Sequence, residues 1–185
     1  TGEANNSRSS YWGNGMYKST DGGKTWVHMG LVESHHIGAI EIHPENPDVL
    51  YVAALGHLYS ENPERGLYKT SDGGKTWNKV LDVVVKGKHI GVVDCVMNPK
   101  NPDVLYAATY DKERKPYTFN LGGPGSRIYK TTDGGATWQE RDGPWPLLFS
   151  PNYAHDHTIL SHDRRSTDGG ETWQKVLYIS PLTGV

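Results

Sequence analysis

Three stretches of this 185-residue chain carry side chains suited to acting on a ligand: residues 1–15, 55–66 and 109–127. They differ wholly from one another, and each combines charged groups with aromatic rings. Rings offer apolar contact area while polar groups orient a ligand, so the mixture indicates a site for a sugar or a peptide. The candidate ligand-binding residues are Glu3, Asn6, Arg8, Trp12, His57, Tyr59, Glu61, Arg65, Asp111, Arg114 and Tyr117. An alternative stays open, in which the aromatic residues pack the long loops onto their scaffold.

Glycoside hydrolysis would need two carboxylates flanking the scissile bond, about 5–5.5 Å apart for retention or about 6.5–9.5 Å for inversion of configuration. The carboxylates available in these stretches are Glu3, Glu61, Glu64 and Asp111. Arginines for an acidic substrate are present in all three, at Arg8, Arg65 and Arg114. Spacing alone assigns none of them a catalytic role.

Histidine pairs raise the question of a metal. His35-His36 and His155-Asp156-His157 lie in polar loop sequence, and neither has a further ligand group at a recognised spacing. Because metal ligands need convergent geometry, we expect no bound metal and no cofactor. His36 and His89 also open two matching His-Ile-Gly segments. They form either a ring at the mouth of the propeller channel that binds an anion or metal, or a packing solution in which histidine and glycine fill positions where strands crowd the axis.

A repeated decapeptide must position these groups. It reads YKSTDGGKTW at 17–26, YKTSDGGKTW at 68–77, YKTTDGGATW at 129–138 and, shortened, RSTDGGETW at 165–173. Aspartate followed by two glycines forms a tight turn, so each copy predicts a hairpin with a tryptophan ring to bury between neighbouring units. We therefore give structural roles to Asp21, Trp26, Asp72, Trp77, Asp133, Trp138, Asp168 and Trp173.

Two further strands precede the second and third hairpins. Each His-Ile-Gly segment runs through a Pro-x-Asn-Pro-Asp turn into Val-Leu-Tyr, at 36–54 and 89–109. With the hairpin this gives four antiparallel strands, a to d, per repeat, which predicts an all-β fold with the blades of a β-propeller. The a–b and c–d turns then share one face, and the variable b–c loops share the other. We place function in the b–c loops.

The Ser/Thr-x-Asp-Gly-Gly-x-Thr-Trp pattern resembles the Asp-box, or bacterial neuraminidase repeat. This repeat occurs in sialidases, sortilin-type receptor domains, xyloglucanase-like glycosidases and a photosystem II assembly factor. The segments TGEANN, HPENPDVLYVAALGHL and FNLGGPGS resemble large secreted bacterial proteins with sortilin-like propellers. The resemblance implies an extracellular, cell-surface or periplasmic protein. No catalytic sequence context of the sialidases or xyloglucanases is visible, so no catalytic residue is carried over.

Three functions fit this resemblance, because one fold serves many activities. The leading expectation is a non-catalytic binding or scaffold propeller that recognises a protein or glycan through its b–c loops. The alternatives are a fragment of a sialidase-like or xyloglucanase-like glycoside hydrolase, and an assembly factor of a membrane complex.

The repeat spacing divides one partial propeller, 1–185, into 1–34 (the end of a blade), 35–82 and 83–143 (blades), 144–177 (truncated or incomplete) and 178–185 (the start of another). In the fourth repeat only Asp163, Arg164 and Arg165 lie between the expected strand b, which ends at His162, and Ser166, so we expect no room for strand c. Either the blade is truncated, or a segment between Asp163 and Ser166 is omitted. Open blade edges predict cover by further blades or another subunit.

Charge and composition narrow the classes of partner that the chain can bind. The net charge is −2 with both signs scattered, which argues against nucleic acid. No apolar run approaches the roughly 18 residues of a membrane span, so no membrane insertion is expected. The single cysteine, Cys95, has no partner for an internal disulfide, and we expect it to be a small buried hydrophobe.

Overall fold

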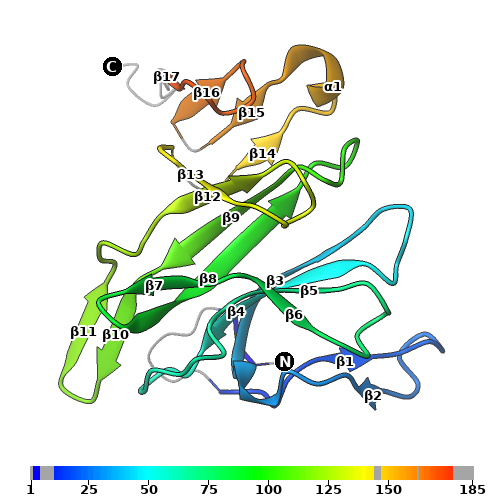
Figure 1. The fold of residues 1–185 in the computed structure, drawn as a ribbon, viewed down its shortest axis with the longest axis vertical. Helices are drawn as coiled ribbons and strands as arrows, with labels where there is room; N and C mark the ends of the chain where they lie inside the picture. Colours follow the sequence, from blue (N-terminus) through cyan, green and yellow to red (C-terminus); the bar gives the residue numbers. More distant parts are fainter. Residues whose placement is uncertain (1, 5–10, 144–146, 162, 177–185) are drawn as a thin grey trace, which may run out of the picture. The chain divides into compact units, whose positions relative to one another are not determined.

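The computed structural model describes residues 2–4, 11–143, 147–161 and 163–176. The chain divides into two compact units, residues 1–140 and 141–185, which are described separately. In the described residues nearly all regular structure is antiparallel β-sheet (Figure 1). Residues 178–185, expected to begin another blade, lie outside the described residues.

Unit 1 contains two sheets that match the predicted blades. The first has the order β3-β4-β5-β6, and the second β13-β12-β9-β8-β7. Strands a to d are therefore β3, β4, β5 and β6 in one blade and β8, β9, β12 and β13 in the next, while β7 pairs with the start of β8. The strands are β3 (His36–Ile42), β4 (Leu50–Gly56), β5 (Gly66–Thr70), β6 (Asn78–Leu81), β7 (Val83–Val85), β8 (Lys88–Met97), β9 (Leu105–Tyr110), β12 (Ile128–Thr131) and β13 (Gln139–Arg141).

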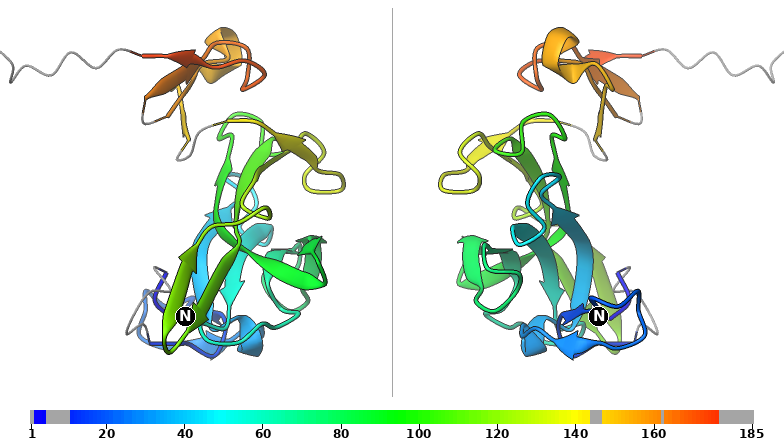
Figure 2. Two further views of the ribbon diagram at one scale, coloured as in Figure 1. Left: turned by 90° about the vertical axis from the view of Figure 1, so that its left-hand side faces the viewer. Right: turned by 90° about the vertical axis from the view of Figure 1, so that its right-hand side faces the viewer.

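Two hairpins complete unit 1. The first repeat supplies β1 (Tyr17–Lys18) and β2 (Val27–His28). The b–c loop of the second blade forms another hairpin, β10 (Lys112–Lys115) with β11 (Thr118–Leu121), which projects beyond its sheet (Figure 1, Figure 2).

Each repeat folds around its aspartate. Asp72 accepts hydrogen bonds from the hydroxyl of Thr70 at 2.7 Å, the hydroxyl of Thr76 at 2.6 Å and the Thr76 backbone N–H at 2.9 Å. Gly73 and Gly74 turn the chain at φ 72° and 92°, a region that favours glycine. The equivalent bonds form around Asp21, Asp133 and Asp168. These bonds use both carboxylate oxygens within the hairpin and give each aspartate a structural role.

The tryptophans link successive repeats. Trp77 donates its indole N–H to the Met29 carbonyl at 2.6 Å, which ties the second repeat to the first, and Trp138 packs on the core of the blades. Trp26, however, is 61% exposed, so the expectation that all four rings are buried is wrong for this residue. A ring of this kind packs on the preceding repeat, and no copy precedes Trp26 in this sequence.

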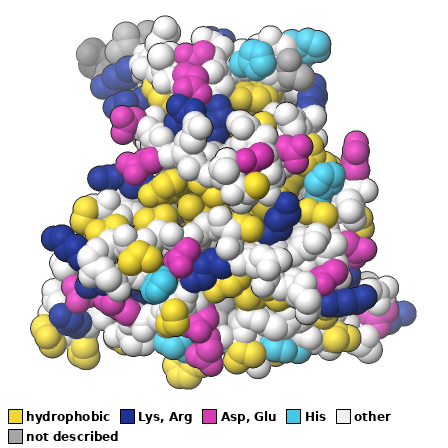
Figure 3. Space-filling model, in the orientation of Figure 1, with side chains coloured by type: hydrophobic (Ala, Val, Ile, Leu, Met, Phe, Trp, Pro, Cys, Tyr) yellow, Lys and Arg dark blue, Asp and Glu magenta, His cyan; other side chains and the backbone are white. Residues whose placement is uncertain are grey.

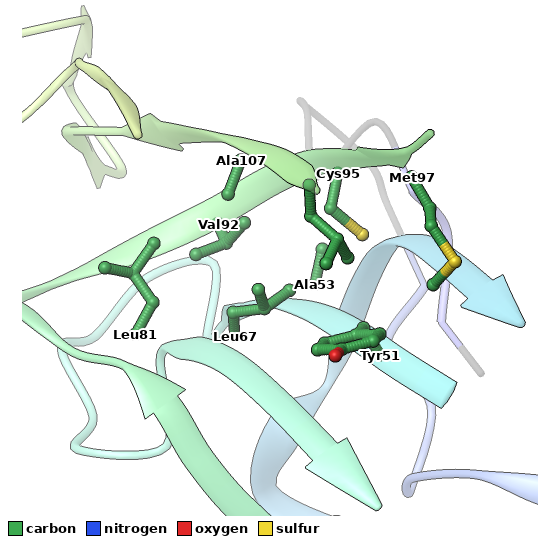
Figure 4. Close-up of a cluster of buried hydrophobic side chains, with 9 residues drawn as sticks. Tyr51, Ala53, Leu67, Leu81, Val92, Cys95, Met97 and Ala107 are labelled. Carbon is green, nitrogen blue, oxygen red and sulfur yellow. The ribbon is translucent and has the colours of Figure 1, made fainter. Parts of the chain in front are cut away.

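The core of unit 1 lies between the two blades. Tyr51 and Leu67 of the first blade face Val92, Cys95 and Met97 of β8 (Figure 4). Cys95 is buried as expected, and burial raises the pKa of its thiol. The Tyr51 hydroxyl donates at 2.8 Å to the carbonyl of Gly134, in the turn of the next repeat. Burial raises the pKa of Tyr51 to about 12, so this hydroxyl keeps the proton that it donates.

Glycine permits the closest contact between the blades. A Cβ on Gly38, in strand β3, would collide with the backbone carbonyl of Val93 in β8. Gly91 of the second His-Ile-Gly segment approaches the backbone of Leu55 in β4 in the same way, and a Cβ on Gly91 would lie 2.9 Å from the Leu55 carbonyl oxygen. The paired glycines therefore serve blade packing, as one of the two interpretations of these segments proposed.

Unit 2 contains a complete but short blade. Its order is β14-β15-β16-β17, with β14 (Leu148–Phe149), β15 (Ile159–Leu160), β16 (Arg164–Ser166) and β17 (Gln174–Lys175). A short helix, α1 (Tyr153–Asp156), occupies its a–b connection. The expectation that strand c has no room is wrong, because Arg164–Ser166 pairs with both neighbours. Strands of two or three residues need less chain than the earlier blades use.

The repeat aspartates predict an acid-sensitive fold. Hydrogen bonds, first those from Thr25 and Thr137, lower the pKa of Asp21 and Asp133 from 3.8 to about 2. Their stabilisation is thus present above pH 3.8 and is lost as the pH falls toward 2. Urea unfolding followed by circular dichroism across this range should show a falling midpoint, and Asp133→Asn should flatten the fall. The control Glu45→Gln replaces an exposed acid outside the repeats and should leave the pH dependence of the urea midpoint as it is in the wild type. If Asp133→Asn also kept the wild-type pH dependence, the structural role of Asp133 would be contradicted.

Gly38 gives a second prediction. Gly38→Ala should lower the free energy of unfolding by about 3 kcal/mol. The added Cβ would meet backbone atoms of Val93, which cannot move aside as a flexible side chain would. Gly87→Ala is the matched control: Gly87 has φ 81° but open space around it, so only backbone strain of about 1 kcal/mol is expected. Equal losses in the two variants, measured by urea unfolding, would show that blade contact does not set the requirement for glycine.

Candidate ligand-binding groove on the b–c loops

The first b–c loop lies against the start of the next blade. The backbone of Gly13 donates to the His35 carbonyl at 2.9 Å, and Gly2 forms a bridge with His36. The His36 ring is buried, with Nδ1 2.9 Å from the carbonyl of Glu3. This position favours the packing interpretation of His36. Glu3 itself is exposed, and Asn6 and Arg8 lie outside the described residues.

The second b–c loop, residues 57–65, is organised by two buried polar residues. Asn62 accepts from the His57 backbone N–H at 2.9 Å and donates to the Glu33 carbonyl at 3.0 Å. Arg65 donates to the carbonyls of His57 and Ser60 at 2.9 and 3.0 Å. Burial lowers the pKa of Arg65, yet these bonds hold its guanidinium in place. Its main role is to shape the loop that carries His57 and Tyr59.

The third b–c loop is the β10–β11 hairpin with residues 122–126. The guanidinium of Arg114 lies 4.8 Å from the centre of the Phe119 ring and 5.8 Å from that of Tyr59, so it joins the second and third loops. Asp111 accepts from the Gly125 N–H at 3.1 Å and shapes its own loop. Tyr117 is at the hairpin tip and is 83% exposed.

These loops enclose two hollows, of about 200 and about 190 Å³, which share Leu58, Tyr59 and Ser60. We call them together the b–c groove. Trp12 and Tyr59 remain 72% and 56% exposed, so ring faces are available along it. The first hollow is also lined by Trp12, His35, His36 and His57, and the second by Glu61, Arg65, Lys112, Glu113, Arg114 and Lys115.

The structure therefore brings together six of the predicted binding residues: Trp12, His57, Tyr59, Glu61, Arg65 and Arg114. Glu3, Asp111 and Tyr117 do not line either hollow. Lys112 of the third loop, which is not among the candidate ligand-binding residues, is buried beside Arg65 and Arg114. Burial, followed by these two cations, lowers the pKa of Lys112 to about 8.

The acidic groups of the groove are ion-paired. Lys88 lies 2.9 Å from a carboxylate oxygen of Glu61 and 3.9 Å from one of Glu113, and Lys115 lies 2.9 Å from Glu113. The hydrogen bond from Lys115, with the charges of both lysines, lowers the pKa of Glu113. A general acid needs the opposite shift. The pairing therefore suits ligand binding better than proton donation.

Three possible metal ligands, Glu33, His35 and His57, meet beside the first hollow. The rings of His35 and His57 stack with centres 3.8 Å apart, and both Nε2 atoms face Oε2 of Glu33. Sequence spacing indicated no further ligand group for the His35-His36 pair, whereas the fold brings Glu33 and His57 to His35. The partner, His57, is 22 positions away in another loop, and only the folded loop brings it there.

Sequence reasoning also missed a carboxylate pair outside the groove. Glu41 and Asp94 each stand five residues after the histidine of a His-Ile-Gly segment, on the a strands of neighbouring blades. Burial, and then the charge of Asp94, raises the pKa of Glu41. Two carboxylates of which one is driven toward its protonated form are typical of acid–base pairs. The repeated acid within an apolar strand was the available signal.

Comparison of the chain with known proteins identifies similar families. The profile of the Sortilin-Vps10 family ("Sortilin, neurotensin receptor 3") matches residues 14–149, and that of the BNR/Asp-box repeat matches residues 164–175. A xyloglucanase of a Paenibacillus species is 28% identical over 155 residues, which cover 75% of this chain and 14% of that protein.

Solved structures show the same fold. An ancestral GH74 enzyme superposes with a TM-score of 0.63 at 20% identity, covering 90% of this chain and 22% of its own. The GH74 enzyme of Niastella koreensis gives 0.60 at 22% identity, covering 88% and 26%. The GH74 xyloglucanase of Xanthomonas campestris gives 0.58 at 16%, covering 89% and 27%. The chain thus spans about a quarter or less of these proteins, as a partial propeller does. Since the matched residues 14–149 make up most of its length, the chain belongs to the Sortilin-Vps10 family of Asp-box β-propellers.

Proposed function

We propose that the b–c groove binds a polysaccharide chain, and that this sequence supplies substrate-binding surface to a glycoside hydrolase of the Asp-box propeller class. The observation that carries the proposal is the pair of hollows joined at Tyr59, with the Trp12 and Tyr59 rings exposed along them. Two neighbouring hollows of this kind offer contacts to successive units of a sugar chain.

The groove has both surfaces that a sugar needs. A sugar ring has an apolar face that packs on an aromatic ring, while its hydroxyl groups hydrogen-bond at the edges. Trp12 is backed by the His35 ring, with centres 6.0 Å apart, and Tyr59 by the Arg114 guanidinium. This backing holds both rings before a ligand arrives, which lowers the entropy cost of binding.

A neutral glucan is the preferred ligand. Glu61 and Glu113 are already paired with Lys88 and Lys115, so an ionic ligand would have to break these pairs. Hydroxyl groups bind such paired charges without displacing them. Two of the similar proteins are named as xyloglucanases, and we propose xyloglucan as the first polymer to test. We place the protein outside the cytoplasm, where such a polymer is met.

The charge distribution supports this choice over nucleic acid. On the face shown in Figure 3, acidic and basic side chains are interspersed and do not gather into one basic patch. A nucleic-acid surface would need a continuous basic stripe.

We assign binding to the groove, because its acidic groups Glu61 and Glu113 are ion-paired with Lys88 and Lys115. The pKa of Glu41 is raised, as a general acid requires, but Glu41 lies on strand β3 and outside the b–c groove. A non-catalytic binding propeller remains the second candidate, and the ion-paired groove carboxylates favour it.

Affinity electrophoresis in gels containing xyloglucan tests the groove. Trp12→Ala and Tyr59→Ala should each weaken retardation by about tenfold, since each removes a stacking surface. Trp26→Ala is the matched control, because Trp26 is similarly exposed but lies in a repeat hairpin outside the groove. The proposal would be contradicted if only Trp26→Ala lost retardation, or if xyloglucan did not retard the wild-type chain at all. Reducing-sugar release by the wild-type chain would show that cleavage also belongs to it.

A further inference from the structure

Glu33, His35 and His57 bring three metal-binding side chains together at one end of the b–c groove. Oε2 of Glu33 lies 3.1 Å from Nε2 of His57 and 3.6 Å from Nε2 of His35, and the three ligand atoms lie within 4.8 Å of one another. From this geometry we infer that the cluster binds a divalent transition-metal ion of the Zn²⁺ class, a site independent of the proposed glycan function.

The separations suit a tetrahedral ion. Zinc binds imidazole nitrogen and carboxylate oxygen at about 2.0–2.2 Å, which places neighbouring ligand atoms of a tetrahedron about 3.3 Å apart. The observed 3.1 and 3.6 Å lie on either side of that value. Because the His35 and His57 rings are stacked at 27°, one imidazole must rotate before both Nε2 lone pairs point at the same ion.

The backbone on one side is held in an unusual conformation. Glu33 belongs to the 3₁₀ helix η1 (Val32–Ser34), which lies between Leu31 at φ 56° and His35 at φ 48°. Non-glycine residues at positive φ cost free energy, and such residues cluster at functional sites. Here the two turns carry Glu33 and His35 toward the same point. The positive φ angles of Leu31 and His35 thus help to bring the Glu33 and His35 side chains together.

The opposite ligand is oriented by its own loop. Nδ1 of His57 lies 2.9 Å from the hydroxyl of Ser60, and its backbone N–H is held by Asn62 at 2.9 Å. A metal-ligating histidine ordinarily has its second ring nitrogen fixed by such a partner, which sets the tautomer and the ring orientation. The Ser60 contact leaves Nε2 of His57 directed at Glu33.

The three side chains offer two imidazole nitrogens and one carboxylate oxygen to an ion. This donor set of two nitrogens and one oxygen favours Zn²⁺ and similar ions over Ca²⁺ and Mg²⁺, which select oxygen ligands.

The hollow of about 200 Å³ beside His35 and His57 leaves room for a fourth ligand, and Trp12, Leu58 and Tyr59 also line it. Three protein ligands with an open fourth position are typical of zinc sites that hold a water molecule or a ligand oxygen. The alternative is a hydrogen-bonded histidine–glutamate cluster that holds only protons, which is an outcome of the test.

Titration of the full chain, carrying no histidine tag, with Co²⁺ tests the inference, because tetrahedral Co²⁺ absorbs visible light. We expect one Co²⁺ per chain, displaced by Zn²⁺. His57→Ala and Glu33→Gln should each weaken binding by about tenfold or more. Glu33→Gln keeps the shape and hydrogen-bonding capacity of the side chain, so it remains informative if His57→Ala unfolds, as judged by circular dichroism.

His155→Ala is the control, since it removes an exposed histidine from unit 2 and should change the affinity by less than about twofold. Absence of Co²⁺ absorption, or equal binding by wild type and Glu33→Gln, would overturn the site and leave the proton-only cluster. Because no glycan is present, failure here says nothing against the glycan groove, and failure of xyloglucan binding says nothing against the metal.

Discussion

Close backbone contact between neighbouring blades is the constraint on which unit 1 depends. At Gly38 the a strand of one blade meets the carbonyl of Val93 in the next without room for a Cβ. That contact allows Tyr51 to reach the turn of the following repeat and closes the core around Leu67 and Val92. With the blades fixed in this way, the loops that leave their b strands are carried to one face, where Tyr59 of one blade meets Arg114 of the next.

The repeated elements were predictable because their causes are local. Each hairpin contains the whole hydrogen-bond set of its aspartate, so four copies gave the c–d strands, and the His-Ile-Gly and Val-Leu-Tyr segments gave a and b. Predictions failed where the cause lay elsewhere in the chain. Trp26 is exposed because the described residues hold no preceding repeat on which its ring could pack, and the fourth blade builds strand c from Arg164–Ser166 by using very short strands.

The candidate site was predictable in place but not in detail. The variable loops indicated the face, and the groove contains six of the residues expected there. Which of them contact a ligand depends on tertiary contacts: Arg65 and Asp111 are engaged in shaping their loops, and His57 reaches Glu33 and His35 only after its loop folds back. Glu41 and Asp94 carried a readable signal, an acid repeated at one position of an apolar strand. The similar proteins favour the glycoside hydrolase alternative over the expected non-catalytic module.

The central claim is that ligand binding belongs to the b–c loops while the Asp-box hairpins only build the blades. Hydrogen–deuterium exchange of the full chain, with and without xyloglucan oligosaccharides, tests both halves at once. We expect slower exchange in residues 57–65 and 112–121 on adding the sugar, and unchanged exchange in the hairpins at 68–77 and 129–138. Protection confined to the hairpins, or no protection in either loop at saturating sugar, would contradict it.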